Sequence, residues 1–452
     1  MAVKYFHHAL KFRKEVCIGC SHCMNVCPTQ AIRINNGKAE LTDNRCVDCG
    51  KCYQVCPVGA IIVKQDDFSQ IFAFSQRVAL IPSVLLGQFP EKVKVSKIYE
   101  VLHKLGFTHV VHVEHGVRIL KKAIEGYLDN NKEKKPLIST FCPAIVRLIQ
   151  VQFPALTENL ILLNAPLDVT ATYIKKHLVD QGFDSKEIGV FYITPCAAKI
   201  AAVKSPVGQE TSDITGVINM DFIFNKVYTN VKRLGLEEDM EVHQSTTSLK
   251  SDEIIWSLTE GESSQMPGRA LAIDEIGNVI EFLENLENEE NPQIDFLELR
   301  ACDQSCAGGI LTSGNRFYTV ERLRKIATQL KEQENNEPKQ ESAIERYEEY
   351  LLQNINLKKV LPRSMNKLDD DTKQAMLKMQ MVREIMKSLP FVDCGLCGSP
   401  TCKSLAEDIA QGKAEVTNCI FVQKKYEKKE WITSADSMEI LKDIWGDDKF
   451  ED

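Results

Sequence analysis

The sixteen cysteines of this 452-residue chain are its most reactive residues, and they fall into four groups of four. Four thiolates are the ligand set of a [4Fe–4S] cluster, so the count predicts four such clusters. The groups are Cys17, Cys20, Cys23 and Cys27; Cys46, Cys49, Cys52 and Cys56; Cys142, Cys196, Cys302 and Cys306; and Cys394, Cys397, Cys402 and Cys419.

The first two groups occur in the runs "CIGCSHCMNVCP" and "CVDCGKCYQVCP", two copies of C-x2-C-x2-C-x3-C-P. This spacing is typical of bacterial ferredoxins, in which the fourth cysteine of each run ligates the other cluster. The doubled run with both prolines argues against zinc, the alternative metal for such cysteine pairs. We assign one cluster to Cys17, Cys20, Cys23 and Cys56, and the other to Cys27, Cys46, Cys49 and Cys52.

In the third group, Cys142, Cys196 and Cys302 each follow a predicted strand, and Cys306 comes four residues after Cys302. Ligands of open α/β sheets bind at the carboxyl ends of strands, so the four could hold one cluster. Pro143 suits the first turn of a helix, whose N-terminus would favour a thiolate at Cys142. A cysteine nucleophile is one alternative, although no histidine base stands out, and four unrelated core thiols are another.

The last group has the spacing C-x2-C-x4-C, followed by a helix-like run and then Cys419, and it predicts the fourth cluster. The preceding helical stretch, 372–389, carries Met376, Leu377, Met379 and Ile385, which we expect to form a packing face. The polar segment 331–341 is expected to be a linker, and the acidic segment 284–293 a surface loop.

The elements that must position the third group alternate between strands and helices. Short apolar runs at 77–82, 109–113, 136–140, 187–196 and 295–302 predict buried strands. Helices are predicted at 95–105, where the face of Val95, Ile98 and Leu102 ends before Gly106, and at 117–128 and 143–153. This succession predicts mostly parallel sheets covered by helices.

Composition limits the class of protein. The net charge of -8 argues against a nucleic-acid partner, and no window is apolar enough for membrane insertion. The first residues lack the apolar core of a signal peptide, so we expect a cytoplasmic protein, where cysteines bind metal more often than they form disulfides. His109, His112 and His115 are not assigned as metal ligands, because their spacing does not place all three on one strand face.

The stretches "TFCPA", "TPCAAK" and "ACDQSCAGG" resemble the three signature loops of [FeFe]-hydrogenases, TSCCP, MPCxxKxxE and ExMACxxGCxxGG. The resemblance covers residues 1–320. It implies that Cys142, Cys196, Cys302 and Cys306 hold a [4Fe–4S] cluster, with Cys306 bridging to a diiron unit that carries CO, cyanide and a dithiolate. Lys199 matches the lysine that contacts a cyanide, and Pro82 and Ser83 resemble the segment that lines the diiron pocket.

Three positions depart from the signature. Phe141 stands where the family has its proton-carrying cysteine, Ala202 replaces the glutamate of the second loop, and Arg300 replaces the methionine of the third. A phenyl ring cannot relay a proton, so low turnover is expected. The tail motif resembles the four-cysteine domain of Rnf-type ferredoxin subunits and of the corrinoid iron–sulfur protein. A hydrogenase core with such a tail is similar to divergent, sensory branches of the family.

The resemblance implies an α/β core of two β/α lobes enclosing the active-site cluster, an α+β ferredoxin domain and a small, mainly helical C-terminal iron–sulfur domain. The expected divisions are 1–74, 75–330, a linker with helices at 331–370, and 371–452. The implied activity is reversible formation of H2 from two protons and two electrons, with a role as an H2 or redox sensor. The alternative is a non-catalytic electron-transfer or cluster-assembly protein without the diiron unit. The implied partners are a ferredoxin or other redox protein, hydrogenase maturation proteins and a signalling partner.

Overall fold

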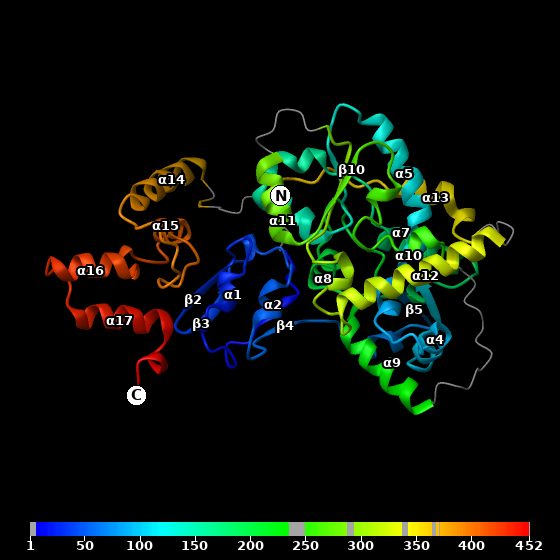
Figure 1. Cartoon of the computed structure of the whole chain (residues 1–452), viewed down its shortest axis with the longest axis horizontal. Helices are drawn as coiled ribbons and strands as arrows, with labels where there is room; N and C mark the ends of the chain where they lie inside the picture. Colours follow the sequence, from blue (N-terminus) through cyan, green and yellow to red (C-terminus); the bar gives the residue numbers. More distant parts are fainter. Residues whose placement is uncertain are drawn as a thin grey trace. The chain divides into compact units, whose positions relative to one another are not determined.

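The computed structural model describes residues 6–234, 249–286, 293–336, 342–363, 368–369 and 371–451. The chain forms two compact units (Figure 1): unit 1 comprises Met1–Ala9 and Gln65–Pro362, and unit 2 comprises Leu10–Lys64 and Arg363–Asp452. Among the described residues, no helix has both the length and the apolar character needed to cross a bilayer.

A four-stranded parallel sheet forms one lobe of unit 1, with strand order β6-β5-β8-β9. Its central strands are buried along most of their length, as expected for a parallel sheet covered on both faces, and every residue of β8 is buried. The strands are β5 (Gln76–Ile81), β6 (His109–His112), β8 (Ile188–Thr194) and β9 (Gly216–Asn219).

A three-stranded parallel sheet with order β10-β11-β7 forms the second lobe. Its central strand, β11, is fully buried, whereas β10 is partly exposed. The strands are β7 (Leu137–Ile138), β10 (Ala270–Ile273) and β11 (Phe296–Leu299). The prediction of two β/α lobes with parallel sheets is therefore confirmed, and the cysteine loops of the third group start from both lobes.

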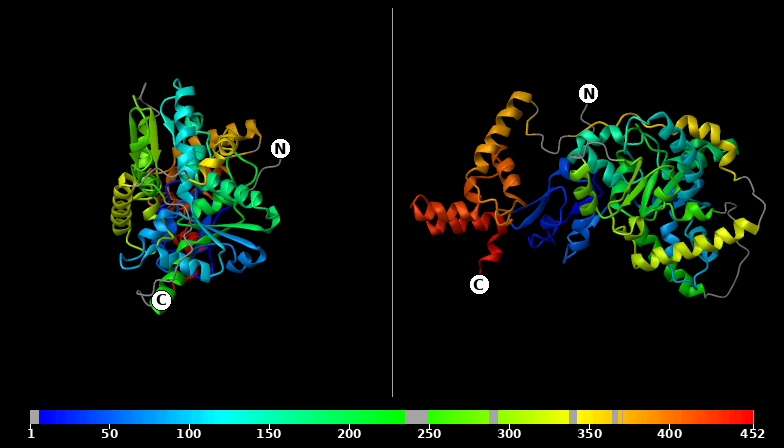
Figure 2. Two further views of the ribbon diagram at one scale, coloured as in Figure 1. Left: turned by 90° about the vertical axis from the view of Figure 1, so that its right-hand side faces the viewer. Right: turned by 45° about the horizontal axis from the view of Figure 1, so that its top comes forward.

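The helices of unit 1 connect the strands and cover the sheets. α12 packs against α3 and α10 and can be followed from two sides in Figure 2. It continues through Asn336, so the predicted linker is helical at 331–336, while 337–341 lies outside the described residues. The helices are α3 (Ser83–Gly87), α4 (Val95–Lys104), α5 (Val117–Asn130), α6 (Pro143–Gln152), α7 (Pro166–Asp180), α8 (Ala197–Lys204), α9 (Met220–Leu234), α10 (Ser251–Ile254), α11 (Ile276–Leu286), α12 (Arg316–Asn336) and α13 (Glu348–Asn354).

Unit 2 combines the ferredoxin-like segment with the C-terminal segment. Two antiparallel strand pairs, β1–β4 and β2–β3, build the first part together with two short helices. These elements are β1 (Leu10–Phe12), β2 (Ile32–Asn35), β3 (Lys38–Leu41), β4 (Ile61–Val63), α1 (His22–Asn25) and α2 (Lys51–Val55). Four helices build the second part: α14 (Thr372–Met386), α15 (Cys402–Ala410), α16 (Ile420–Lys428) and α17 (Ser434–Trp445).

The predicted packing face of α14 is wrong for Met376, Leu377 and Met379, whereas Ile385 packs against the core as predicted. Met376 and Met379 are 65% and 51% exposed, whereas Val382 is buried in a core shared with Leu405 and Val422. Methionines at helical spacing predict a helix. They do not predict which side of that helix another element will cover, so the same pattern is compatible with an exposed face.

The two parts of unit 2 are joined by backbone and ionic contacts. The backbone N–H of Gly37, in the turn between β2 and β3, donates to the carbonyl of Ile444 at 3.0 Å. Arg33 forms an ion pair with Asp408 at 2.5 Å, and the buried Arg45 pairs with the buried Glu407. Residues about 370 positions apart in the sequence therefore belong to one compact body.

Candidate metal centres

The third cysteine group lies in three loops at the carboxyl ends of strands. Cys142 follows β7 as the N-cap of α6, and Cys196 follows β8 as the N-cap of α8. Cys302 follows β11, and Cys306 lies in the 3₁₀ turn Ser305–Gly308. The N-termini of α6 and α8 direct partial positive charge toward Cys142 and Cys196.

Electrostatic coupling connects three of these cysteines: Cys142, Cys196 and Cys306. Burial raises the pKa of Cys196 to about 12, and although Lys199 opposes this, the charges of Cys306 and Cys142 add to the rise. Thiolates that repel one another in a buried site need a cation among them, and iron would supply it. The donor set fits a [4Fe–4S] cluster in its number and chemistry, and its members follow the carboxyl ends of β7, β8 and β11.

Lys199 is the cation that contacts a cysteine of this site. Its Nζ atom lies 3.5 Å from Sγ of Cys306, and the residue is 7% exposed. Burial acts to lower the pKa of Lys199, but the negative charges of Cys306, Tyr192 and Cys196 outweigh it and raise the pKa above the usual lysine value. The ammonium group therefore stays charged beside the cysteines and can bind a further anion there.

The ring of Phe141 contacts two buried cations. Nζ of Lys199 is 4.6 Å from the centroid of its ring, and the guanidinium carbon of Arg300 is 4.0 Å from it. An aromatic face attracts cations most strongly where water is excluded, and Phe141 is only 7% exposed. Phe141, which stands where the signature has a cysteine, therefore interacts with both buried cations of the site.

Arg300 is held by a buried network of carboxylates. Its guanidinium pairs with Glu262 at 2.9 Å and with Glu298 at 3.4 Å, and the hydroxyl of Ser139 donates to Glu262 at 2.7 Å. Burial raises the pKa of Glu262, while Arg300 counteracts the rise. The network links β11 to the residue two positions before Phe141, so Arg300 and Phe141 form one structural feature.

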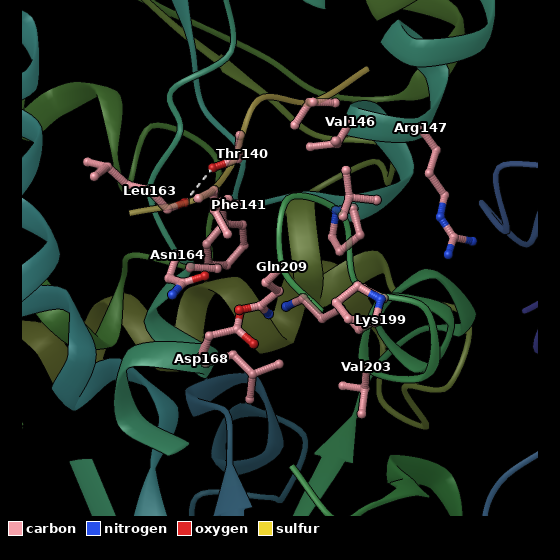
Figure 3. A pocket seen from close by; sticks show the side chains of 18 of the residues that line it. Thr140, Phe141, Val146, Arg147, Leu163, Asn164, Asp168, Lys199, Val203 and Gln209 are labelled. Carbon is pink, nitrogen blue, oxygen red and sulfur yellow. Dashed lines mark hydrogen bonds between the residues drawn. The ribbon is translucent and has the colours of Figure 1, made fainter. Parts of the chain in front are cut away.

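A cavity of about 90 Å³ lies beside Lys199 and Phe141 (Figure 3). Ala202, the second departure from the signature, also lines it. Asp168 contributes the acidic group of the wall; burial raises its pKa to about 6, although a hydrogen bond from Gln209 counteracts the rise. The cavity combines apolar walls with a few polar groups, as small-ligand sites do.

Pro82 and Ser83 lie at the carboxyl end of β5, where Pro82 is the N-cap of α3. The backbone N–H of Ser83 donates to Glu114 at 2.7 Å, and its hydroxyl lies 3.1 Å from that of Ser257. The carbonyl of Ser257 accepts from the backbone N–H of Cys306 at 3.2 Å. Ser83 is therefore connected to the Cys306 loop through one intervening residue.

Two buried residues of this region were not predicted from the sequence. Glu114 follows the carboxyl end of β6, and Tyr192 lies in β8 four residues before Cys196. The hydroxyl of Tyr192 has no hydrogen-bond partner among the described residues, and its charge is coupled to those of Lys199 and Cys196. A polar residue directly after a buried strand was the available signal for Glu114; Tyr192 looked like an ordinary strand residue.

The eight ferredoxin-like cysteines line two separate cavities of about 20 Å³ each. The cysteines that share a cavity also influence one another's pKa. Burial raises the pKa of Cys23 to about 12, and the charges of Cys17, Cys20 and Cys56 add to the rise. Burial likewise raises the pKa of Cys49 to about 12, with Cys27 contributing. The first cavity is lined by Cys17, Cys20, Cys23 and Cys56, and the second by Cys27, Cys46, Cys49 and Cys52.

The tail cysteines also line one cavity, together with Asp393. Burial raises the pKa of Cys397 to about 11, with smaller contributions from Cys419 and Cys394. Asp393 accepts a hydrogen bond from the backbone N–H of Cys402 at 2.6 Å, which fixes the loop at the start of α15. The four cysteines of this cavity are Cys394, Cys397, Cys402 and Cys419.

Three segments match known protein families. Residues 75–223 match the family described as iron only hydrogenase large subunit, C-terminal domain. Residues 8–66 match the 4Fe-4S dicluster domain, and residues 389–421 match the family described as "Putative Fe-S cluster". The matches lie in the segments where the sequence showed hydrogenase-like, ferredoxin-like and tail motifs.

Curated relatives match parts of the chain. One component of the ion-translocating oxidoreductase complex from Rhodobacter capsulatus is 54% identical over 39 residues, which are 9% of this chain and 21% of that protein. The large subunit of a corrinoid/iron-sulfur protein from Moorella thermoacetica is 38% identical over 63 residues, 14% of each chain. The NADP-reducing hydrogenase subunit HndD from Solidesulfovibrio fructosivorans is 24% identical over 234 residues, 49% of this chain and 36% of that one.

Among solved structures, the [FeFe]-hydrogenase HydA1 from Chlamydomonas reinhardtii is similar to this chain, with a TM-score of 0.49 and 15% identity over 64% of this chain and 94% of the other. The chain spans only about a fifth of the length of the first curated relatives it matches. The family matches show that residues 75–223 are similar to the iron only hydrogenase large subunit, and that residues 8–66 and 389–421 are similar to iron–sulfur cluster domains.

Proposed function

We propose that this protein carries out reversible H2 chemistry, 2H⁺ + 2e⁻ ⇌ H2, at low turnover, and that it acts as an H2 or redox sensor. The observation that supports the proposal most directly is the buried ammonium of Lys199 at 3.5 Å from Sγ of Cys306. A permanent positive charge in a buried site stabilises anions strongly, so it fits both a bridging thiolate and a cyanide ligand.

A diiron unit bound at Cys306 would supply the metal at which protons and electrons combine. Cys142, Cys196, Cys302 and Cys306 would hold the adjoining [4Fe–4S] cluster, and Lys199 would bind a cyanide of the unit. Pro82 and Ser83 would border it, because Ser83 is connected to the Cys306 loop through Ser257. The apolar wall formed by Phe141 would exclude water from this side.

Low turnover follows from the groups around the site. Phe141 offers no exchangeable proton, and Ala202, on the wall of the same cavity, offers none either. Slow chemistry suits a sensor, whose output is the redox state of its clusters. The clusters of unit 2 would exchange electrons with a ferredoxin or another redox protein and report to a signalling partner in the cytoplasm, and hydrogenase maturation proteins would deliver the diiron unit.

Infrared spectroscopy of the matured protein tests the proposal, because CO and cyanide bands have no other source in it. The cluster-loaded protein is treated with a diiron complex under anaerobic conditions, and H2 evolution is measured with a strong reductant. We expect CO and cyanide bands in the wild type, shifted cyanide bands in Lys199→Gln, and a smaller shift in Lys199→Arg, which keeps the charge. Wild-type protein with all its clusters but without these bands would contradict the proposal.

One observation favours a second function. Arg300 and Phe141 pack against each other beside the cysteine loops, and both are larger than the small residues that a bulky ligand would need beside it. If they fill the place of the diiron unit, the third group holds only a [4Fe–4S] cluster and the chain is an electron-transfer or cluster-assembly protein. The same infrared experiment separates the two functions, since only the first gives CO bands.

A further inference from the structure

We propose that Tyr99, His112 and Glu114 form a proton relay that leads from α4 to Ser83, beside the cysteine loops. The inference rests on the proposed function for its purpose, since proton delivery matters only if protons react at this site. The three side chains belong to the lobe of the four-stranded sheet, whereas Phe141 and Arg300 follow strands of the three-stranded sheet.

The relay begins on α4. Tyr99 is half-buried on that helix, and its hydroxyl is hydrogen-bonded to Nε2 of His112 at the end of β6. Burial lowers the pKa of His112 to about 4, so the ring is neutral at pH 7. A neutral ring that accepts the phenolic hydrogen at Nε2 carries its own hydrogen on Nδ1.

The second step joins His112 to Glu114. Nδ1 of His112 lies 3.9 Å from Oε2 of Glu114, and neither atom has another hydrogen-bond partner among the described residues. A separation of this size is bridged by one water molecule or by a small rotation of the carboxylate. Both residues are more than nine-tenths buried, so bulk water does not compete for the proton.

The third step reaches the site. Oε1 of Glu114 accepts from the backbone N–H of Ser83 at 2.7 Å, and the hydroxyl of Ser83 continues the path to the hydroxyl of Ser257 at 3.1 Å. Ser257 is the residue whose carbonyl binds the backbone of Cys306. The relay therefore ends one residue from the proposed bridging cysteine.

Glu114 has the acidity that a relay needs. Burial raises its pKa to about 7, and hydrogen bonds from Ser83 and the charge of Lys199 limit the rise. Its charge is also coupled to Tyr99 on α4 and Tyr192 on β8, while His112 faces it from β6. A general acid works best when its pKa is near the working pH, and this carboxyl can both bind and release a proton there.

Proton movement along the chain is balanced at each atom. A proton from water reaches the oxygen of Tyr99 as the phenolic hydrogen passes to Nε2 of His112, and the hydrogen on Nδ1 passes to the carboxylate of Glu114. The neutral acid then delivers its proton to the hydroxyl of Ser83, which passes its own hydrogen to the hydroxyl of Ser257 at the same time. Ser257 releases its hydrogen to the group that takes up protons at the proposed site, Glu114 is again a carboxylate, and a turn of the His112 ring restores the hydrogen on Nδ1. Tyr99 and His112 are both neutral before and after the transfer. The raised pKa of Tyr99 and the lowered pKa of His112 therefore do not prevent it.

Infrared difference spectroscopy on protein that contains only [4Fe–4S] clusters tests the relay without the diiron unit. Spectra at low and high pH should show the carbonyl stretch of a protonated buried carboxyl with a midpoint near pH 7. The band should be lost in Glu114→Gln, and in His112→Gln its midpoint should move by about half a unit or more. His115→Gln is the matched control: His115 is equally buried in the same loop, but neither ring nitrogen has a hydrogen bond in the described structure.

A second measurement uses matured protein. H2 evolution should fall about 100-fold in Glu114→Gln and in His112→Gln, and Glu114→Asp should restore part of the loss. The relay is contradicted if the carboxyl band has the same midpoint pH in His112→Gln as in wild type. It is also contradicted if Glu114→Gln has intact CO bands and evolves H2 at the wild-type rate. Absence of CO bands in the wild type would contradict the proposed function, and the carboxyl band would still report on the relay.

Discussion

The guanidinium carbon of Arg300 lies 4.0 Å from the centroid of the Phe141 ring, and both side chains are buried. The two positions belong to different signature loops, 159 residues apart, yet their departures from the hydrogenase pattern contact each other. A change at one position therefore alters the surroundings of the other, and variants at the two positions are expected to be non-additive.

Replacing Arg300 tests how strongly the buried network depends on its cation. Arg300→Met leaves the buried carboxylates of Glu262 and Glu298 without it, so we expect a loss of about 3 to 5 kcal/mol in unfolding free energy. Adding Glu262→Gln should recover part of the loss. Lys358→Met, at an exposed ion pair with Glu210, is the control and should stay within about 0.5 kcal/mol of wild type. Denaturation followed by circular dichroism under anaerobic conditions gives the comparison, and equal effects at Arg300 and Lys358 would refute it.

Restoring the missing proton carriers should raise the rate of H2 formation. Phe141 and Ala202 line the same cavity, so Phe141→Cys and Ala202→Glu should act together and exceed the product of their separate effects. General acid–base groups contribute about 10² to 10⁴-fold, and the lost ring packing will reduce that gain. The rate is measured with a strong reductant, with Phe141→Leu as the variant that removes the ring without adding a thiol. A double variant with intact CO bands and a wild-type rate would show that proton delivery at this position is not limiting.

Iron content tests the four-cluster prediction. Four [4Fe–4S] clusters hold about 16 iron atoms per chain, and a diiron unit would raise this to about 18. Anaerobic reconstitution without maturation proteins should stop near the lower value, measured as iron and sulfide per chain. Cys397→Ala should lower it by about four, because Cys397 lines the tail cavity with its three partners. A saturated preparation with about eight iron atoms would contradict the prediction.

The tail should support the ferredoxin-like segment as well as hold a cluster. Truncation after Lys358 should remove about four iron atoms and leave the infrared signature of unit 1 intact. It also removes Glu407 and Asp408, the partners of Arg45 and Arg33, so the clusters of residues 17–56 should be lost at a lower temperature. Glu407→Gln should show the same trend at a cost of about 2 kcal/mol, while Glu384→Gln, at an exposed pair, should not. Unchanged cluster loss on heating in the truncated protein would contradict this coupling.

The pH dependence of stability should separate His112 from Glu114. The pKa of His112 falls to about 4 on folding, so between pH 4 and 6.5 the unfolded chain binds more protons and stability falls as pH is lowered. The pKa of Glu114 rises to about 7, so between pH 4.5 and 7 the folded chain binds more protons and stability falls as pH is raised. Each slope approaches about 1.4 kcal/mol per pH unit.

In the wild type, the pH dependence due to His112 and that due to Glu114 have opposite signs. Each variant removes one of them, so the other can be measured. Relative to wild type, His112→Gln should gain in Tm as pH falls from 6.5 to 5, and Glu114→Gln should lose in Tm over the same range. Measuring the three proteins side by side cancels the acid sensitivity of the clusters. Parallel curves for all three would refute the assigned directions.

The sequence alone predicted which ferredoxin-like and tail cysteines line a common cavity, and it predicted most of the element order. Ligand spacing in the two ferredoxin-like runs is local, and the strands before Cys142, Cys196 and Cys302 are recognisable as short apolar runs. The predicted helix at 95–105 and strand at 187–196 correspond to α4 and β8 within a few residues. Such features depend on neighbours within one element, which the periodicity of side chains records.

Only the tertiary structure decided which groups surround these loops. Arg300 contacts Phe141, and Glu114 accepts a hydrogen bond from Ser83, because the strand orders β10-β11-β7 and β6-β5-β8-β9 place the carboxyl ends of these strands side by side. Strand order results from long-range packing, which local residue patterns do not encode. The same reason applies to the exposed methionines of α14 and to the packing of the tail with the ferredoxin-like segment in unit 2. The free energy gained by burying a helix face depends on which surface is available to cover it.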